Sequence, residues 1–382
     1  MLQSIVVYSI MCLVLYYATN NFSVTRQGKE IIFKKHRSYG VGIFLALFVF
    51  AFFSGVRWDV GIDHLTYVDF YQTIARWGDG TIRGDLEEGY VLLMKIFNLF
   101  GFHYTFFMAF IAFCQLGFIY YAFKDEKYII PFLGVCIMCG GDFFLWMNIM
   151  RQALVTTCFV FLLTHFLVYK KFIPYLICLI IASFIHKTAI LLIIFYPLTY
   201  LPLEKIYLQR KYQYVIFLGA LCMSFSNIWM NMLDQVDIIL SVIGYDDRFN
   251  MDILENTVRE KNFGVRKILF LIIDFIIIYN SPKLRSYFSN RIFGLMYIFY
   301  FILIISQPLL ESSMVFNRIT GYFYTFRAII SSYMLFYVFR INRKGINKIL
   351  GILLLLCYFF HIFIQILTDK GGHTDCIRYQ FF

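Results

Sequence analysis

The chain has 382 residues, of which 60% are hydrophobic and only 15% are charged, and it contains 46 Phe and 29 Tyr. Soluble domains are roughly half apolar and about a quarter charged, so this balance excludes an ordinary water-soluble domain. The net charge of +11 does not indicate nucleic-acid binding, because the basic residues lie mainly in short loops between apolar runs, as the positive-inside rule expects.

Uncharged runs at 41–55, 102–123 and 349–367 are close to the roughly 20 residues that a helix needs to span a bilayer. In hydrocarbon the backbone must satisfy its own hydrogen bonds, so these runs are predicted to be helices. The sequence lacks the short alternating strands of an outer-membrane barrel. We therefore predict an all-α fold, a polytopic helical bundle in one transmembrane domain, 1–382, with about 10–12 membrane helices, some broken or re-entrant.

Loop charges predict how the chain is oriented in the membrane. Segment 2–18 has no basic residues before it and five after it, at 19–39, so we predict a retained helix with its N-terminus outside. The long loops 55–88 and 231–264 each carry seven acidic and three basic residues, and both are predicted to lie outside. The remaining runs alternate around cytoplasmic loops 280–291 and 340–348 and leave the tail 368–382 outside: 212–230, 265–279, 292–310, 318–339 and 349–367.

The middle of the chain does not fit a simple alternation. Basic pairs at 170–171 and 210–211 both favour the cytoplasm, yet one apolar stretch, 172–200, lies between them. A broken pair of half-helices that enters and returns would resolve the conflict, with His186 near the turn. By the same parity, the run 89–101 would lie along the outer face or dip into it. The alternative is a plain thread of about twelve crossings with the first basic pair outside.

A crowded polar segment follows the second predicted helix. Arg57 is a planar donor suited to phosphate or carboxylate, while Asp59 and Asp63 would anchor it or accept hydrogen bonds from sugar hydroxyls. A folded loop held by internal ion pairs is an equally good alternative. Glu87 and Glu88 open the next segment, a position that the helix dipole alone would explain.

Ionisable residues inside apolar runs are candidates for function because they are costly in a membrane. Arg151, with Gln152 beside it, and Arg318 each begin a helix at the predicted outer interface. Two helix N-termini add positive dipole character, so we predict an outward-facing cationic pocket for a lipid-linked phosphate or pyrophosphate. For Arg151, snorkelling to the interface is the alternative. Asp274 is predicted to pair with Arg318 or with Arg327, about 2.5 turns deeper.

His186 and Lys187 interrupt a long apolar stretch. A histidine on an apolar helix is often held by a backbone carbonyl and nothing more, whereas an ionisable residue in a membrane is a functional candidate; the sequence leaves both open. Cys136 and Cys139 form a CxxC motif inside an apolar run without further ligands, so no metal site and no cofactor are predicted.

The order of these residues resembles the EpsG family of Wzy-type polysaccharide polymerases, which make exopolysaccharide, capsule or O-antigen. The likeness covers nearly the whole chain. The tail 377–381 resembles the family's closing Tyr-Pro-Tyr element, with Arg378 in place of the proline. In chain order the landmarks are Gly55-Val-Arg57-Trp-Asp59-Val-Gly61-Ile-Asp63-His-Leu-Thr-Tyr67, Glu88-Gly89-Tyr90, Met150-Arg151-Gln152-Ala153, Phe184-Ile-His186-Lys187-Thr-Ala189 and Asn317-Arg318-Ile-Thr-Gly-Tyr322-Phe.

The resemblance implies a multi-pass enzyme of the bacterial cytoplasmic (inner) membrane that joins oligosaccharide repeat units carried on undecaprenyl pyrophosphate. It implies inverting glycosyl transfer on the outer face, without a nucleotide sugar or a metal. The implied partners are the lipid-linked oligosaccharide, membrane lipid, and a flippase and a chain-length regulator of the same pathway. Both termini would lie outside.

Under this resemblance, Arg151 and Arg318 would stabilise charge on the departing pyrophosphate, an effect worth several kcal/mol per well-placed donor. The acceptor hydroxyl needs a general base, for which His186 and Asp63 are the candidates, with Glu88 as a further one. His186 qualifies only if its turn reaches the outer pocket. The residues expected to bind substrate are Arg57, Asp59, Tyr67, Glu88, Tyr90, Gln152, Lys187 and Tyr322.

Other functions fit parts of the pattern. A flippase for lipid-linked oligosaccharides would also place cations near lipid phosphate, but flippases usually show repeated halves, and this sequence shows none. A membrane O-acyltransferase acting on polysaccharide would use an intramembrane histidine, but it takes its acyl donor from the cytoplasmic side. A non-enzymatic scaffold explains none of the cations inside the apolar runs.

Overall fold

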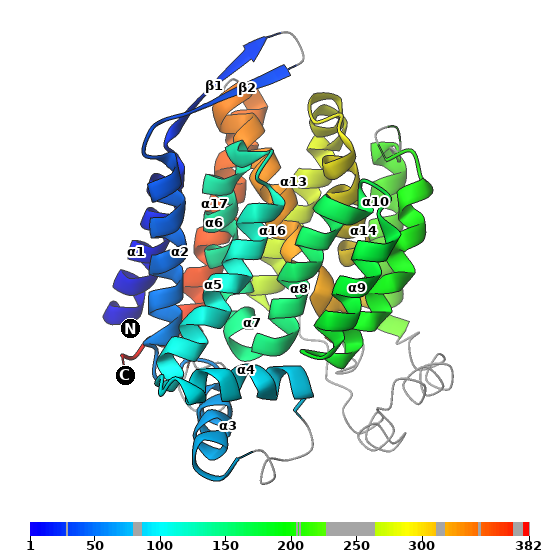
Figure 1. Ribbon diagram of the computed structural model, residues 1–382. Helices are drawn as coiled ribbons and strands as arrows, with labels where there is room; N and C mark the ends of the chain where they lie inside the picture. The colour runs from blue at the N-terminus through cyan, green and yellow to red at the C-terminus, as the bar shows by residue number, and fades with distance from the viewer. Residues whose placement is uncertain are drawn as a thin grey trace. The chain divides into compact units, whose positions relative to one another are not determined.

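The structure is a computed structural model that describes residues 1–27, 30–78, 86–203, 205, 208–226, 264–310, 318–342, 345–369 and 377–381. Helices contain 81% of these residues, so the predicted all-α fold is confirmed (Figure 1). The chain divides into two compact units: unit 1 is Met1–Tyr200 with Ser331–Phe382, and unit 2 is Leu201–Ile330. All but the last residue of the predicted outer loop 231–264 lies outside the described residues.

Most helices of unit 1 match the apolar runs to within a few residues. In chain order its elements are α1 (Leu2–Thr19), β1 (Phe22–Gln27), β2 (Glu30–Lys35), α2 (Tyr39–Gly55), α3 (His64–Trp77), α4 (Glu88–Leu99), α5 (Tyr104–Ala122), η2 (Lys127–Ile129), α6 (Ile130–Cys139), α7 (Asp142–Asn148), α8 (Met150–Leu162), the π-helix η3 (Leu163–Leu167), α9 (Phe172–Ser183), the 3-10 helix η4 (Lys187–Tyr200), the second part of α16 (Tyr324–Phe336), the π-helix η9 (Tyr337–Ile341) and α17 (Gly345–Thr368).

Several helices are long and apolar enough to cross a membrane. Among the described residues these are α1, α5, the segment Met150–Leu167, α14 (Arg291–Leu310) and α17. A sixth span arises if α6 and α7 are taken together, although the chain bends by 62° between them, and α2, α9 and η4 are apolar but shorter. The protein is therefore a polytopic helical membrane protein, with fewer full-length spans in the described part than the number predicted.

Two local features of unit 1 were not predicted. The first is the bend between α6 and α7, where Gly141 has a φ of +89°, which glycine adopts without steric cost. The second is an antiparallel hairpin of β1 and β2 within the predicted cytoplasmic loop 19–39, in which Phe22 pairs with Lys35. Each strand contains two adjacent β-branched residues, which favour extended backbone.

The long apolar stretch that holds His186 reverses its direction halfway, as predicted for a broken pair of half-helices. Its two parts, α9 and η4, pack side by side. The Tyr175 hydroxyl donates to the Leu192 carbonyl (2.6 Å), and the Tyr196 hydroxyl donates to the Lys170 carbonyl (2.9 Å). The beginning and the end of the stretch therefore lie together, and His186 is in the turn at the opposite end.

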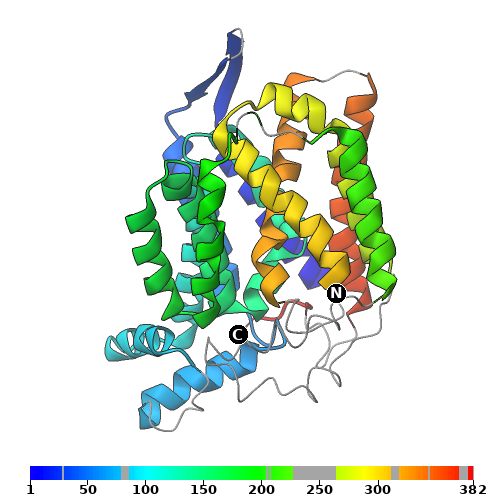
Figure 2. The ribbon, with the colours of Figure 1, turned by 90° about the vertical axis from the view of Figure 1, so that its right-hand side faces the viewer.

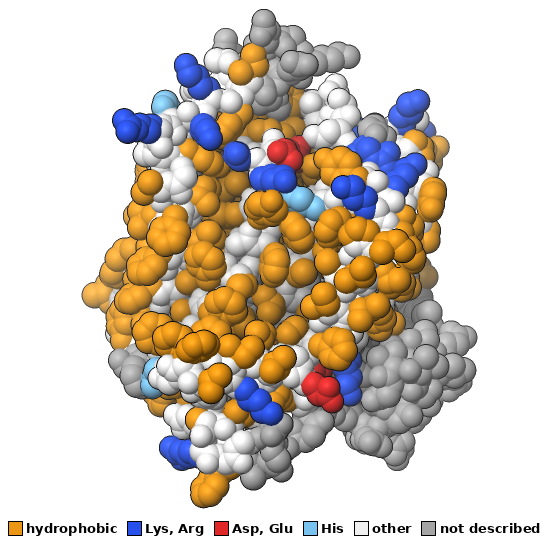
Figure 3. Space-filling model, in the orientation of Figure 1, with side chains coloured by type: hydrophobic (Ala, Val, Ile, Leu, Met, Phe, Trp, Pro, Cys, Tyr) orange, Lys and Arg blue, Asp and Glu red, His pale blue; other side chains and the backbone are white. Residues whose placement is uncertain are grey.

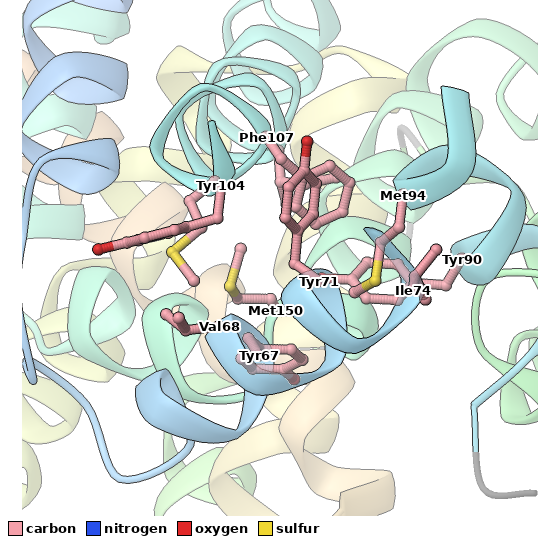
Figure 4. Close-up of a cluster of buried hydrophobic side chains, with 11 residues drawn as sticks. Tyr67, Val68, Tyr71, Ile74, Tyr90, Met94, Tyr104, Phe107 and Met150 are labelled. Atoms are coloured by element: carbon pink, nitrogen blue, oxygen red, sulfur yellow. The ribbon is translucent and has the colours of Figure 1, made fainter. Parts of the chain in front are cut away.

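Two helices lie across one end of unit 1 instead of along it. In both ribbon views α3 and α4 are at the end opposite the β1–β2 hairpin (Figures 1 and 2), which agrees with the prediction for the run 89–101. Figure 4 shows the core beneath them, with Tyr67 on α3, Tyr90 on α4, Phe107 on α5 and Met150 at the start of α8. Each fully buried ring contributes on the order of 1.5–3 kcal/mol, so this core fixes the positions at which α4 and α8 begin.

Basic residues gather at the hairpin end of unit 1. Arg340 donates to Asn20 Oδ1 (2.6 Å), just before β1, and the Lys127 ammonium lies 5.9 Å from the centre of the Tyr39 ring at the start of α2. On the face drawn in Figure 3, Lys and Arg are concentrated beyond one edge of a broad hydrophobic band. Under the positive-inside rule the hairpin end is predicted to be cytoplasmic and the α3–α4 end to be outside.

Unit 2 is also helical. Its elements are α10 (Arg210–Met223), η5 (Ser224–Ser226), α13 (Val265–Tyr287), α14, η8 (Gly321–Phe323) and the first part of α16. The expectation of a loop over 280–291 is corrected, because α13 continues to Tyr287. Its last turn carries Arg285, and a cation there interacts favourably with the negative end of the helix dipole.

The core of unit 2 contains a buried ion pair. Arg327 donates from Nε and Nη2 to the two carboxylate oxygens of Asp274, each at 3.0 Å, and Tyr300 donates its hydroxyl to the same carboxylate (3.1 Å). Arg327 also donates to Gln307 Oε1 (2.8 Å). The predicted pairing of Asp274 is confirmed, with Arg327 as its partner.

Candidate functional site

The candidate site forms where the start of α4 meets the turn between α9 and η4. The Gly89 amide donates to the Phe184 carbonyl (2.9 Å). A Cβ at position 89 would lie 2.6 Å from that oxygen, so only glycine permits this approach. Two landmarks that are far apart in the sequence are thereby brought into contact.

Glu87, the residue immediately before α4, is at the centre of this contact. Its Oε1 lies 3.0 Å from His186 Nδ1 and accepts a hydrogen bond from the Lys187 amide (3.3 Å). Its Oε2 forms an ion pair with Arg151 at the start of α8. The exposed fraction of the side chain is 5% for Glu87, 13% for His186 and 22% for Arg151, so the histidine and the arginine are more accessible than the carboxylate.

The electrostatics of Glu87 determine which nitrogen of His186 carries a proton. Burial raises the pKa of Glu87, but His186 and Arg151 outweigh burial and lower it to about 2. An ionised carboxylate only accepts hydrogen bonds, so Nδ1 of His186 is the donor. In the neutral ring this leaves Nε2 as a proton acceptor, and no described residue forms a hydrogen bond with it.

Two buried tyrosines line the site beside Arg151. The centre of the Tyr90 ring lies 6.0 Å from Cζ of Arg151 and 6.2 Å from the centre of the Tyr67 ring. Burial raises the pKa of both phenols, so both stay protonated near neutral pH. The Tyr90 hydroxyl is buried without a hydrogen-bond partner among the described residues, which is uncommon for such a group.

Arg57 supports the site from beneath. Its guanidinium is fully buried and donates to the carbonyls of Ser54, Val60 (3.1 Å) and Met147 (3.4 Å). Burial lowers the pKa of Arg57 to about 10, so it remains charged at neutral pH. No described carboxylate pairs with it; instead it ties the loop after α2 to the end of α7.

Three further predicted residues adjoin this cluster. Glu88 and Lys187 are exposed, and each follows directly on a residue of the Glu87–His186 pair. Gln152 is buried one position after Arg151. The structure therefore places the predicted Tyr67, Tyr90, Arg151 and His186 together, with Glu88, Gln152 and Lys187 next to them.

The other predicted residues are not part of this cluster in unit 1. Asp59, with a φ of +50°, and Asp63 are half-buried in the turn before α3. Arg318 is exposed and Tyr322 is buried, and both belong to unit 2. The shared pocket of Arg318 and Arg151 stays a prediction.

Sequence reasoning missed Glu87, which it treated as an ordinary acid at a helix start. Glu87 and Glu88 differ in backbone conformation. Glu87 is extended (φ −66°, ψ 139°) and its side chain is buried, whereas Glu88 is in the first turn of α4 and is exposed. The signal that was available is Gly89, because a glycine inside the first turn of a helix indicates close approach of another segment.

The arrangement combines a proton acceptor, a fixed carboxylate and a cation in one cluster. The described residues contain no group of three or more His, Cys, Asp or Glu that would hold a metal ion. No curated protein and no solved structure matches the chain. The model of the EpsG family matches residues 41–381, which include the whole of the cluster around Glu87. The chain therefore belongs to the EpsG family.

Proposed function

We propose that the protein is a polysaccharide polymerase that joins lipid-linked oligosaccharide repeat units by glycosyl transfer at the outer face of the membrane. Membership of the EpsG family makes it a membrane protein of polysaccharide biosynthesis, of the Wzy-like type. The finer proposal rests on one observation: His186 Nδ1 lies 3.0 Å from Glu87, whose other oxygen is paired with Arg151.

His186 is the general base in this proposal. Its Nε2 takes the proton of the acceptor hydroxyl while that oxygen attacks the anomeric carbon of the donor sugar. The new glycosidic C–O bond replaces the bond between this carbon and the lipid pyrophosphate, which leaves with the electron pair. Glu87 holds the ring in the Nδ1–H tautomer and stabilises the imidazolium that forms, by the logic of a carboxylate–histidine pair.

Arg151 acts on the leaving group. Negative charge develops on the pyrophosphate oxygens as the bond breaks, and the partly exposed, planar guanidinium of Arg151 offers donors in the geometry that phosphate accepts. Tyr67 and Tyr90, kept protonated by burial, complete the wall beside it. Arg318 is proposed as a second cation for the same pyrophosphate.

The test is a deletion strain that carries variants of the chain, with polymer length and lipid-linked material as the readouts. Arg151→Ala and His186→Ala should leave single repeat units on the outer face, whereas Asp69→Asn, at an exposed carboxylate on α3, should give normal polymer. Units trapped inside the cell would indicate a flippase, and polymer of normal length that lacks acyl groups would indicate an acyltransferase. Normal polymer in both alanine variants, at normal membrane levels, would end the proposal.

A further inference from the structure

An apolar groove runs along unit 1 between α1, α6 and α17. Two adjoining hollows, of about 740 Å³ and about 380 Å³, share Ser9, Cys12 and Phe359 and so form one groove. On α17 it extends from Leu355 to Ile366, or about 17 Å at 1.5 Å per residue. This length is close to one leaflet, which is half of a hydrocarbon core about 30 Å thick.

A cation lies at one end of this groove. Arg340 lines the groove and is half-buried within the π-helix η9, and π-turns occur frequently at functional sites. Its guanidinium donates to Asn20 Oδ1 (2.6 Å), and no described acidic residue pairs with it. One amide oxygen uses only part of a group with five N–H donors. A cation at the end of a long apolar groove is complementary to an anion that carries an apolar tail.

We propose that the groove binds a membrane phospholipid with an anionic headgroup. The phosphate contacts Arg340, and one acyl chain lies along α1 and α17. The Arg340 end of the groove is at the hairpin end of unit 1, and no residue of the Glu87–His186 cluster lines the groove, so this lipid stabilises the bundle and takes no part in glycosyl transfer.

The walls favour a flexible chain over a helix of another protein. Helices in membranes approach each other closely through small residues. Small residues line this groove at Ser9, Cys12 and Cys139, but most of its lining side chains are large and many are aromatic. Phe132 stacks on Phe339 with ring centres 6.1 Å apart, and Tyr16 contacts Phe132 at 5.6 Å. Side chains of this size keep a further helix from close backbone contact, whereas a chain of methylene groups packs against them without needing such contact.

The test compares two lipids on the purified full-length protein by native mass spectrometry. Phosphatidylglycerol and phosphatidylcholine with identical chains differ in headgroup charge, so the wild type should bind phosphatidylglycerol more tightly. Arg340→Gln should weaken phosphatidylglycerol binding about fivefold and leave phosphatidylcholine unchanged. Arg340→Lys should retain the preference, and Lys124→Gln, which removes a charge from the same end of unit 1, should behave as wild type.

A second variant tests the groove itself. Ser9 is exposed and lines both hollows, so the larger side chain in Ser9→Trp narrows the groove and should reduce binding of both lipids equally. An unchanged lipid preference in Arg340→Gln would overturn the proposal. Unchanged binding in Ser9→Trp would overturn it too, because the acyl chain would then lie elsewhere. A co-purifying protein that Ser9→Trp releases, without any lipid preference in the wild type, would replace the lipid by a partner helix.

Discussion

At the scale of single residues, the charge of Glu87 matters as well as its hydrogen bond to His186. The carboxylate stays ionised down to about pH 2, so it stabilises a protonated His186 throughout the physiological range. Glu87→Gln keeps an acceptor oxygen but removes the charge. Because an uncharged neighbour stabilises the imidazolium less, we expect polymerisation to fall on the order of 10²-fold and the acid limb of its pH–rate profile to move to lower pH.

This effect is measured by polymerisation of lipid-linked repeat units by purified protein across pH, with Asp69→Asn, at an exposed carboxylate on α3, as the matched control. If the pH profile of the control shifted as much as that of Glu87→Gln, the cause would be the loss of any negative charge at this end of unit 1. A pH profile that is unchanged in Glu87→Gln would remove Glu87 from the mechanism while leaving Arg151 to be judged separately.

His64 provides a prediction about pH and stability. It is fully buried, and neither ring nitrogen has a partner among the described residues. Burial, with a contribution from Arg57, lowers its pKa to about 3, whereas an unfolded histidine titrates near 6.5. Below pH 6.5 the unfolded chain therefore binds more protons at this position than the folded one, and stability falls as the pH is lowered towards 3.

At pH 5 this residue should cost the folded protein roughly 2 kcal/mol relative to pH 7.5, at about 1.4 kcal/mol per pH unit. His64→Leu should remove that share, and His103→Leu, at an exposed position, should not. Thermal unfolding in detergent at the two pH values measures the difference. If His64→Leu and the wild type lost equal stability at pH 5, another group would have to be the source.

At the scale of elements, the contact between α4 and the α9–η4 turn positions the site. A methyl group at Gly89 would lie 2.6 Å from the Phe184 carbonyl, so Gly89→Ala must push the two elements apart. Because Glu87 and His186 flank this contact, we expect a loss of polymerisation of at least 10²-fold, since misplacement of catalytic groups by about 1 Å has effects of that size. Gly117→Ala is the matched control: it is also a helical glycine, but with open space around it.

Activity in Gly89→Ala should be compared at equal protein levels in the membrane, and Gly117→Ala should keep full polymer length. A drop in both variants would indicate a general intolerance of the helices. A fully active Gly89→Ala would mean that the elements yield without disturbing the Glu87–His186 pair.

An element is predicted best from the sequence where a single property, such as the length of an uncharged run or the charge of a loop, determines it. Uncharged length alone located α2 and α5, and loop charge alone required the reversal at His186. The bend at Gly141 was not predicted because an apolar run can hold a break without any change of composition. Glu87 and Glu88 are chemically identical, so only tertiary contact separates the buried acid from the exposed one. In the same way, only tertiary contact shows that Arg57 is buried among backbone carbonyls instead of exposed at the surface.

At the scale of the molecule, the C-terminal residues hold unit 1 together at the end that carries the site. The Tyr379 hydroxyl donates to the Phe53 carbonyl on α2 (2.7 Å), and its amide donates to Ser4 Oγ on α1 (2.9 Å). The Trp58 amide, next to Arg57, donates to the Gln380 carbonyl (2.9 Å). The tail thus links the first helix, the second helix and the loop that supports the site.

Removal of residues 377–382 should therefore destabilise unit 1. The described tail residues form six hydrogen bonds with the rest of unit 1. At about 1 kcal/mol each, with one buried aromatic ring at roughly 2 kcal/mol, their removal gives a loss of about 8 kcal/mol. Thermal unfolding of the purified protein measures this loss, and polymerisation should fall with it because the loop around Arg57 loses its anchor. Unchanged stability in the truncated protein would show that the contacts of the tail contribute nothing to the free energy of unfolding.

Arg378 permits a finer test within the same tail. Its side chain is exposed, but its amide donates to Asp369 Oδ2 (2.7 Å), as does the amide of Ile377. A proline at this position, as in the family's closing element, has no amide hydrogen to donate. We therefore expect Arg378→Ala to match the wild type, Arg378→Pro to lose about 1 kcal/mol, and the truncation to lose the most. A larger loss in Arg378→Ala than in Arg378→Pro would assign the tail's contribution to the guanidinium instead of the backbone.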